Sequence, residues 1–191
     1  MTDTSDARSR RWEATHQRIY DAAMALFTER GFDAVSVGQI AAAARVSVPT
    51  FYAHYPSKEH VIMQLPTAED LAALLRGQPA DLPVGSRLRA AAPVWFAQWT
   101  WEERAETLAR WKIIASTPAL RTRAALFERE TAGYVADALP PAQAPLSAAD
   151  SIIINAYLAA YTAGMLAWAD GDGERKLEEL VDEAFQVLDQ G

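Results

Sequence analysis

No cysteine occurs in the chain, and this absence excludes disulfide bonds, thiolate nucleophiles and cysteine-ligated zinc. Histidine is almost as scarce, because His16, His54 and His60 are the only three and all lie in the first third of the sequence. The HExxH pattern of metalloproteases, glycine-rich phosphate loops and the GxSxG turn of hydrolases are also missing. We therefore expect no catalytic residue, no metal and no cofactor, and we do not expect an enzyme.

Two further kinds of segment are missing. The alternation of polar and apolar residues typical of β-strands appears nowhere, whereas apolar residues recur at helical spacing through most of the chain. The N-terminal 18 residues contain no apolar core of the kind that secretory signals need, so we expect a cytoplasmic location. With 191 residues, half of them apolar, the chain can form one large domain or two small ones. The expected fold class is all-α.

The acidic charge is unevenly distributed. A net charge of −7 by itself argues against a nucleic-acid partner, because acidic surfaces repel a duplex. Residues 1–60, however, contain seven Lys or Arg and seven Asp or Glu, whereas the remaining residues contain 11 and 18. The whole acidic excess therefore lies beyond residue 60. The arginines Arg8, Arg10, Arg11 and Arg18 give the first part a modest basic surface that suits phosphates.

Residues 36–58 have the pattern of a helix, a tight turn and a second helix, followed by the start of a third. Ser36 and Gln39 stand three apart at the head of an apolar series, which is the spacing of a capping box. Ser47 is placed to cap the next helix, and Pro49 fits its first turn, where a missing N–H is tolerated. Such a unit is typical of the helix-turn-helix, whose second helix places side chains against base edges in the major groove.

This stretch closely resembles the DNA-binding domain of the TetR family of transcriptional regulators. The matching residues are Gly31-Phe32, Ser36-Val37, Ile40-Ala41, Ala44, Val46-Ser47, Thr50-Phe51-Tyr52, His54-Tyr55 and Ser57-Lys58-Glu59. Arg45 and Pro49 depart from the family, which usually has glycine at the first position and often at the second. If the turn needs a positive φ, Arg45 brings strain but also adds a cation near the phosphates. The resemblance implies a homodimer that binds a palindromic operator in double-stranded DNA.

On the second helix of this unit, one side is expected to be buried and the other to face DNA. We expect Val48, Phe51 and Tyr52 in the buried set, and small polar residues in the exposed one. The predicted DNA contacts, some to bases and some to phosphates, are Gln39, Arg45, Ser47, Thr50, Tyr52, His54, Tyr55 and Lys58. Tyr55 could instead pack within the unit, and His54 could instead be a surface histidine without a role in DNA binding. The phosphate contact of Lys58 is implied by the resemblance.

The rest of the chain is predicted to be helical. A helix over about residues 10–30 follows a mobile polar segment and ends at Gly31. Ser57 caps a fourth helix, which Pro66 either kinks or splits. Further helices are expected over residues 86–100, 101–116, 118–139, 147–170 and 174–189, with Pro140–Pro145 ending the third of these. We place a domain boundary after residue 60, so that 1–60 forms the DNA-binding domain and 61–191 a helical effector-binding and dimerisation domain.

The segment from Ser151 to Ala169 carries no charge, and its length invites a membrane span. Polar residues dilute it, however, and Asp150 and Asp170 flank it without a nearby cation, so we expect no membrane. A helix that is apolar on nearly every face must be packed against other helices on nearly every face. We therefore expect helices 147–170 and 174–189 to form the interface of a homodimer.

Aromatic residues gather in the second domain, where they suit either a core or the wall of an apolar pocket. The candidate ligand-binding residues are Trp95, Trp99, Trp111, Phe127, Tyr134, Tyr157 and Tyr161. The resemblance to the TetR family implies that this domain binds a small effector that releases DNA. Residues 78–188 resemble, more weakly, the C-terminal domain of mycofactocin-system-type regulators, which implies an apolar or acyl-type effector. The predicted function is a ligand-responsive transcriptional regulator, most simply a repressor. The alternative is a helical ligand-binding or protein-interaction module without DNA recognition.

Overall fold

The computed structural model describes residues 3–64, 66–139 and 146–189. The chain divides into two compact units, Met1–Gln64 and Leu65–Gly191. The division lies four residues beyond the boundary placed from the sequence. Every regular element in the described part of the chain is an α-helix, so the expected all-α fold is confirmed. The two units are described separately below.

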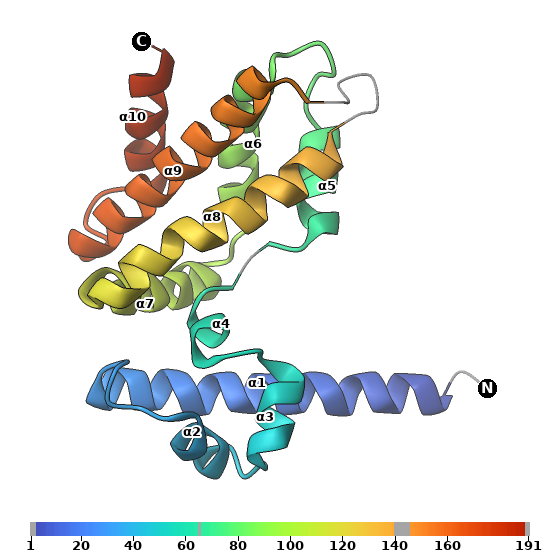
Figure 1. Cartoon of the computed structure of the whole chain (residues 1–191), viewed down its shortest axis with the longest axis vertical. Coiled ribbons are helices and arrows are strands. Elements are labelled where there is room, and N and C mark those ends of the chain that lie inside the picture. The colour runs from blue at the N-terminus through green and yellow to red at the C-terminus, as the bar shows by residue number, and fades with distance from the viewer. Residues whose placement is uncertain (1–2, 65, 140–145, 190–191) are drawn as a thin grey trace. The chain divides into compact units, whose positions relative to one another are not determined.

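The N-terminal unit is built on one long helix that carries three short ones. Its helices are α1 (Asp3–Arg30), α2 (Val37–Ala43), α3 (Val48–His54) and α4 (Lys58–Ile62). Helix α1 packs against α2 and α4, and α2 packs against α3 (Figure 1). The segment before residue 10, predicted to be mobile, is helical from Asp3 onward. Gly31 ends α1 as predicted, with a φ of +80° that favours glycine.

The core of this unit draws buried apolar residues from all four helices, with the largest share from α1. Ile19, Phe27, Ile40 and Phe51 are all almost completely buried. Phe27 also packs against Phe32 in the turn after α1, with 5.0 Å between ring centroids. Because α2 and α3 have only seven residues each, too few for stability alone, their contact with α1 holds them in place.

In its described residues, the C-terminal unit contains six helices, one of which is long and central. They are α5 (Ala68–Arg76), α6 (Val84–Ala97), α7 (Trp101–Ser116), α8 (Pro118–Ala138), α9 (Ala148–Asp170) and α10 (Leu177–Asp189). Helix α9 packs against α6, α7, α8 and α10 (Figure 1). Of the two alternatives at Pro66, the split is found, because α4 ends at Ile62 and Thr67 caps α5 through a capping box with Asp70. The predicted stop at Pro140–Pro145 lies outside the described residues.

Helix α9 has the length and apolar composition of a membrane span, with a hydropathy of 1.4 in its most apolar window. A helix in the core of a globular unit passes the same test, and α9 packs against four neighbours within its unit. Only 33% of that window is buried within one chain. Ser147 and Asp150 form a capping box at its start. Much of an apolar helix therefore remains open on the surface of a single chain.

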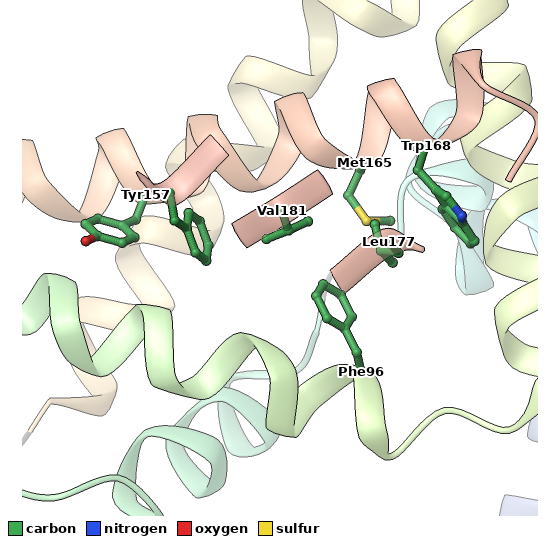
Figure 2. Close-up of a cluster of buried hydrophobic side chains, with 7 residues drawn as sticks. Phe96, Tyr157, Met165, Trp168, Leu177 and Val181 are labelled. Carbon is green, nitrogen blue, oxygen red and sulfur yellow. The ribbon is translucent and has the colours of Figure 1, made fainter. Parts of the chain in front are cut away.

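Two apolar clusters hold the C-terminal unit together. The first joins α6, α9 and α10 through Phe96, Tyr157, Met165, Trp168, Leu177, Val181 and Phe185 (Figure 2). The second joins α5, α6, α8 and α9 through Leu75, Val84, Ala91, Val135, Leu139 and Ile154. Gly164 lets α9 and α10 approach closely, because a Cβ added there would lie 2.9 Å from the Cα of Val181. The packing of these two helices therefore depends on a missing side chain.

Candidate nucleic-acid interface

The turn between α2 and α3 is shaped by local hydrogen bonds. The Ser36 hydroxyl accepts from the Gln39 backbone N–H while the Gln39 side chain accepts from that of Ser36, the predicted capping box. The Ser47 hydroxyl accepts from the Thr50 N–H at 3.1 Å and caps α3. Between them Arg45 has a φ of 55°, the left-handed conformation anticipated from its place in the turn. The guanidinium Nε of Arg18, on α1, donates to the Ala44 carbonyl at 3.0 Å.

Helix α3 buries one face and exposes the other, but the sets differ from those expected. Phe51 is fully buried, as predicted. Val48 and Tyr52 were expected to be buried and are instead 40% and 53% exposed. Helix α3 has only seven residues, and Phe51 is its one buried side chain. Val48 and Tyr52 are therefore exposed to solvent. The exposed Tyr52 brings an aromatic ring and a hydroxyl to the surface of the reading helix.

An aromatic cluster holds the C-terminal end of α3 against α1. The His54 ring lies 4.7 Å from that of Trp12 and 5.7 Å from that of His16, between centroids. His16 stacks on Tyr55 at 4.1 Å, and the Tyr55 hydroxyl donates to the His16 carbonyl. Tyr55 is buried, so in this structure it packs within the unit, which was the alternative to a DNA contact. Burial lowers the pKa of both histidines. The charge of His54 lowers the pKa of His16 further, and the charge of Arg18 lowers that of His54.

Lys58 occupies the first turn of α4 beside a shallow depression in this unit. Its ammonium donates to the carbonyls of Phe32 and Val35, both at 3.0 Å, and lies 4.2 Å from the centre of the Phe32 ring. An ammonium has three donors, so one N–H remains for another acceptor. The depression has a volume of about 410 Å³ and is lined by Asp33, Ala34, Val35, Ser36, Val37, Tyr52, Ser57, Lys58 and Glu59. Ser57, expected to cap α4, instead hydrogen-bonds to His60.

Five of the seven candidate ligand-binding residues come together in the C-terminal unit. Tyr157 belongs to the buried cluster of Figure 2, and Trp95, Trp99, Trp111 and Tyr161 pack against that cluster. The remaining two, Phe127 and Tyr134, lie on α8 and belong to neither described cluster. The Tyr157 hydroxyl donates to Asp189 at 2.8 Å, so it ties α9 to α10.

The polar edge of this aromatic group centres on Tyr161. Its ring stacks on Phe96 with 5.8 Å between centroids. Burial raises the pKa of the Tyr161 hydroxyl, while a hydrogen bond with Trp95 and the charge of Arg110 act in the opposite direction. The Arg110 guanidinium donates to the Thr107 hydroxyl at 3.2 Å. Arg110 and Thr107 therefore form a polar pair on α7, and the charge of Arg110 is felt by the Tyr161 hydroxyl on α9.

Each of the two units matches a known protein-family model. Residues 19–65 match the model of the bacterial regulatory proteins of the tetR family. Residues 82–191, more than half of the chain, match the model of the MftR C-terminal domain. The chain belongs to the TetR family. It is a transcriptional regulator with a helix-turn-helix DNA-binding domain, not an enzyme.

Individual curated relatives of this TetR-family regulator match about a third of its length. The uncharacterized regulator YdeS of Bacillus subtilis is 48% identical over 60 residues, 30% of each chain. The repressor KstR of Mycolicibacterium smegmatis is 34% identical over 71 residues, 33% of this chain and 35% of KstR. The chain thus spans about a third of the length of these curated relatives. A solved structure of Thermus thermophilus FadR, a TetR-family repressor in complex with lauroyl-CoA, is also similar. The two sequences are 25% identical and the TM-score is 0.55. The match covers 91% of this chain and 92% of the FadR chain.

Sequence reasoning missed several parts of the TetR-type reading unit. Trp12 and His16 lie four residues apart on α1 and stack at 4.9 Å, yet nothing in their spacing pointed to α3. Ser36 and Val37 were predicted as the start of a helix, whereas the structure also places them in the wall of the depression beside Tyr52 and Lys58. The backbone N–H of Val37, in the first turn of α2, could have suggested an anion contact.

Proposed function

We propose that this TetR-family regulator represses transcription by binding a palindromic operator as a homodimer, and that a small apolar effector releases it. The proposal rests above all on helix α3, which presents Tyr52 and Ser47 to solvent while Phe51 anchors it in the unit. A seven-residue helix held in this way suits entry into the major groove, where a few side chains meet base edges. Both FadR and KstR are described as repressors.

The DNA contacts divide into two groups on this proposal. Tyr52, Thr50 and Gln39 face the groove, whereas Arg45, Ser47 and Lys58 contact the phosphates at its edges. A phosphate group is proposed at the depression beside Lys58, because the ammonium of Lys58 lies there with Tyr52 and the start of α2; the carboxylates of Asp33 and Glu59 also line it and limit how close an anion comes. His54 packs against Trp12, so its proposed contribution is through the edge of its ring and through the position of α3.

The homodimer is proposed to form through α9 and α10. Ile152 on α9 and Val187 on α10 are 69% and 71% exposed, although both are large and apolar. Most of the apolar window of α9 is uncovered in a single chain. Two such helices meeting their counterparts around a two-fold axis would cover these faces and fix two reading helices for two half-sites.

Effector binding is proposed among the aromatic residues between α6, α7 and α9, in particular Trp95, Trp99, Trp111 and Tyr161. FadR, whose solved structure contains lauroyl-CoA, supports an effector with an apolar chain. An effector that binds more tightly to a conformation unable to hold the operator lowers DNA affinity by the ratio of its two affinities. The short segment between α4 and α5 connects the two units along the chain and would transmit this change.

A gel-shift assay with the DNA flanking the gene tests the proposal. The wild-type protein is expected to shift this DNA as a dimer. The double variant Thr50→Ala/Tyr52→Ala is expected to bind at least about 100-fold more weakly, since each lost base contact costs about 1–3 kcal/mol in each half-site. Thr28→Ala, at an exposed position of α1, is the control and should bind as the wild type does. Retained specific binding by the double variant would refute the assignment of α3.

A further inference from the structure

Arg110 differs from the other arginines that are at least partly buried in the C-terminal unit. Arg89 pairs with Asp182, and Arg104 pairs with Glu178 at 2.6 Å. Arg87 donates to the carbonyls of Pro79 and Ala80. Arg110 contacts the Thr107 hydroxyl, and among the described residues it has neither a carboxylate nor a carbonyl partner. Its positive charge is therefore uncompensated within the described part of this unit.

One nitrogen of Arg110 is also poorly satisfied. The Nε atom is closed off from solvent and has no hydrogen-bond partner in the structure. A buried donor without an acceptor is unfavourable, and a guanidinium without a counter-charge is more so. Such a group calls for an explanation, and a ligand that supplies the missing acceptor is one. The Nε and an adjacent terminal nitrogen of arginine form the side of the fork that suits the two oxygens of a carboxylate.

The surroundings of Arg110 indicate what kind of ligand this is. Thr107 is buried one turn before Arg110, and Trp111 follows Arg110 in the sequence and packs on the cluster of Figure 2. The charge of Arg110 reaches the Tyr161 hydroxyl on α9, where it counteracts the effect of burial on that group. The cation thus lies next to a residue of an aromatic cluster, with the Thr107 hydroxyl in contact with it.

We propose that Arg110, with the Thr107 hydroxyl beside it, binds the carboxylate of an otherwise apolar effector. This inference rests on the effector binding proposed above, and it assigns the chemical class of the effector as an amphiphilic carboxylic acid. The apolar part of the molecule packs among Trp95, Trp99 and Trp111. A single unpaired guanidinium matches a single carboxylate, whereas a ligand with several phosphate groups needs more cations. Arg104, which also lies near Trp99, is already neutralised by Glu178.

Calorimetric titration of the full chain with three probes tests the assignment. The probes are laurate, dodecanol and lauroyl-CoA, which share one apolar chain and differ in the head group. The wild-type protein is expected to bind laurate more tightly than dodecanol. Arg110→Gln is expected to weaken laurate binding roughly 10- to 100-fold, the value of a charge-assisted hydrogen bond, and to leave dodecanol binding unchanged. Arg110→Lys should recover part of the loss.

Lys112→Gln is the matched control, because it removes the same charge from an exposed position of the same helix. This variant should bind laurate as the wild type does. Far-UV circular dichroism and the melting temperature show whether Arg110→Gln is folded, and its unchanged affinity for dodecanol shows that the aromatic site is intact. Equal laurate affinities of Arg110→Gln and the wild type would overturn the assignment. So would binding of lauroyl-CoA without binding of laurate, since the phosphates would then be the recognised anion.

The outcome is separable from that of the proposed function, because these titrations contain no DNA. If the wild type binds dodecanol but not laurate, the carboxylate assignment fails and an apolar effector remains. If the wild type binds none of the three probes and none of them releases the operator in a gel shift, effector binding fails together with this inference. Operator binding itself is judged only by the variants of α3.

Discussion

The two units of this regulator obtain their structure in different ways. In the N-terminal unit, short-range hydrogen bonds set each turn: Ser36 with Gln39, Ser47 with Thr50, and Gly31 with its positive φ. In the C-terminal unit, contacts between helices distant in the sequence decide the arrangement, as at Gly164 and Val181 or at Arg104 and Glu178. The turns of the first unit are therefore set mainly by residues close in sequence, whereas the arrangement of the second unit depends more on packing between distant helices.

The largest expected effect comes from disturbing the close approach of α9 and α10. In Gly164→Ala the new Cβ would lie 2.7 Å from the Val181 Cγ2 and 2.9 Å from its Cα, so the helices must move apart. We expect the free energy of unfolding of the C-terminal unit to fall by about 1–3 kcal/mol, measured by urea denaturation. The N-terminal unit should not be affected, because its turns do not depend on this contact.

Gly133→Ala on α8 is the control for this substitution. A Cβ at Gly133 meets nothing within 4 Å, so only the higher helix propensity of alanine acts, and stability should rise by up to about 1 kcal/mol. Equal effects of the two substitutions would show that close packing at Gly164 is unimportant, and the contrast between the two units would lose its main support.

A smaller effect, confined to the N-terminal unit, is expected on acidification. The pKa values of His16 and His54 are lowered in the folded state, so folding favours their neutral forms. The stability that they contribute is present above the unfolded pKa of about 6.5 and is lost as the pH falls through the folded-state pKa values. The melting temperature, followed by circular dichroism, should therefore decrease between pH 7.5 and 5.5.

The double variant His16→Gln/His54→Gln separates this contribution from that of the many carboxylates. Its melting temperature should decrease less than that of the wild type over the same pH interval. Identical pH dependence in the two proteins would contradict the lowered pKa values. Operator affinity is expected to follow the same trend, because the cluster of Trp12, His16 and His54 holds the end of α3 against α1.

The smallest effect is expected at Arg45, which adopts the left-handed conformation at a φ of 55°. Arg45→Gly removes the steric cost of a Cβ there, offset in part by the greater freedom of glycine in the unfolded chain, so the unit should gain up to about 1 kcal/mol. Salt titration of operator binding should also show a slope reduced by about one for each protomer, since one phosphate contact is lost. An unchanged slope would remove Arg45 from the interface.

Sequence patterns predicted the helices of this regulator better than the faces that they expose. The capping boxes at Ser36, Thr67 and Ser147 are local, so residue type and spacing suffice to identify them. The exposure of Val48 and Tyr52 was predicted wrongly, because seven residues are too few for periodicity to define a buried face. The cluster of Trp12, His16 and His54 also escaped prediction, since it joins helices 38 or more positions apart.

The amino-acid sequence by itself determined the all-α class, the membership of the TetR family and the position of the reading helix. These properties depend on short-range caps, on apolar periodicity and on a dense local motif, all of which can be read along the chain. Only the tertiary structure decided that Tyr52 faces solvent, that five aromatic candidates form one group and that Arg110 lacks a counter-charge. Exposure and pairing depend on which distant helices meet, and in a unit assembled around α9 that information lies in the packing.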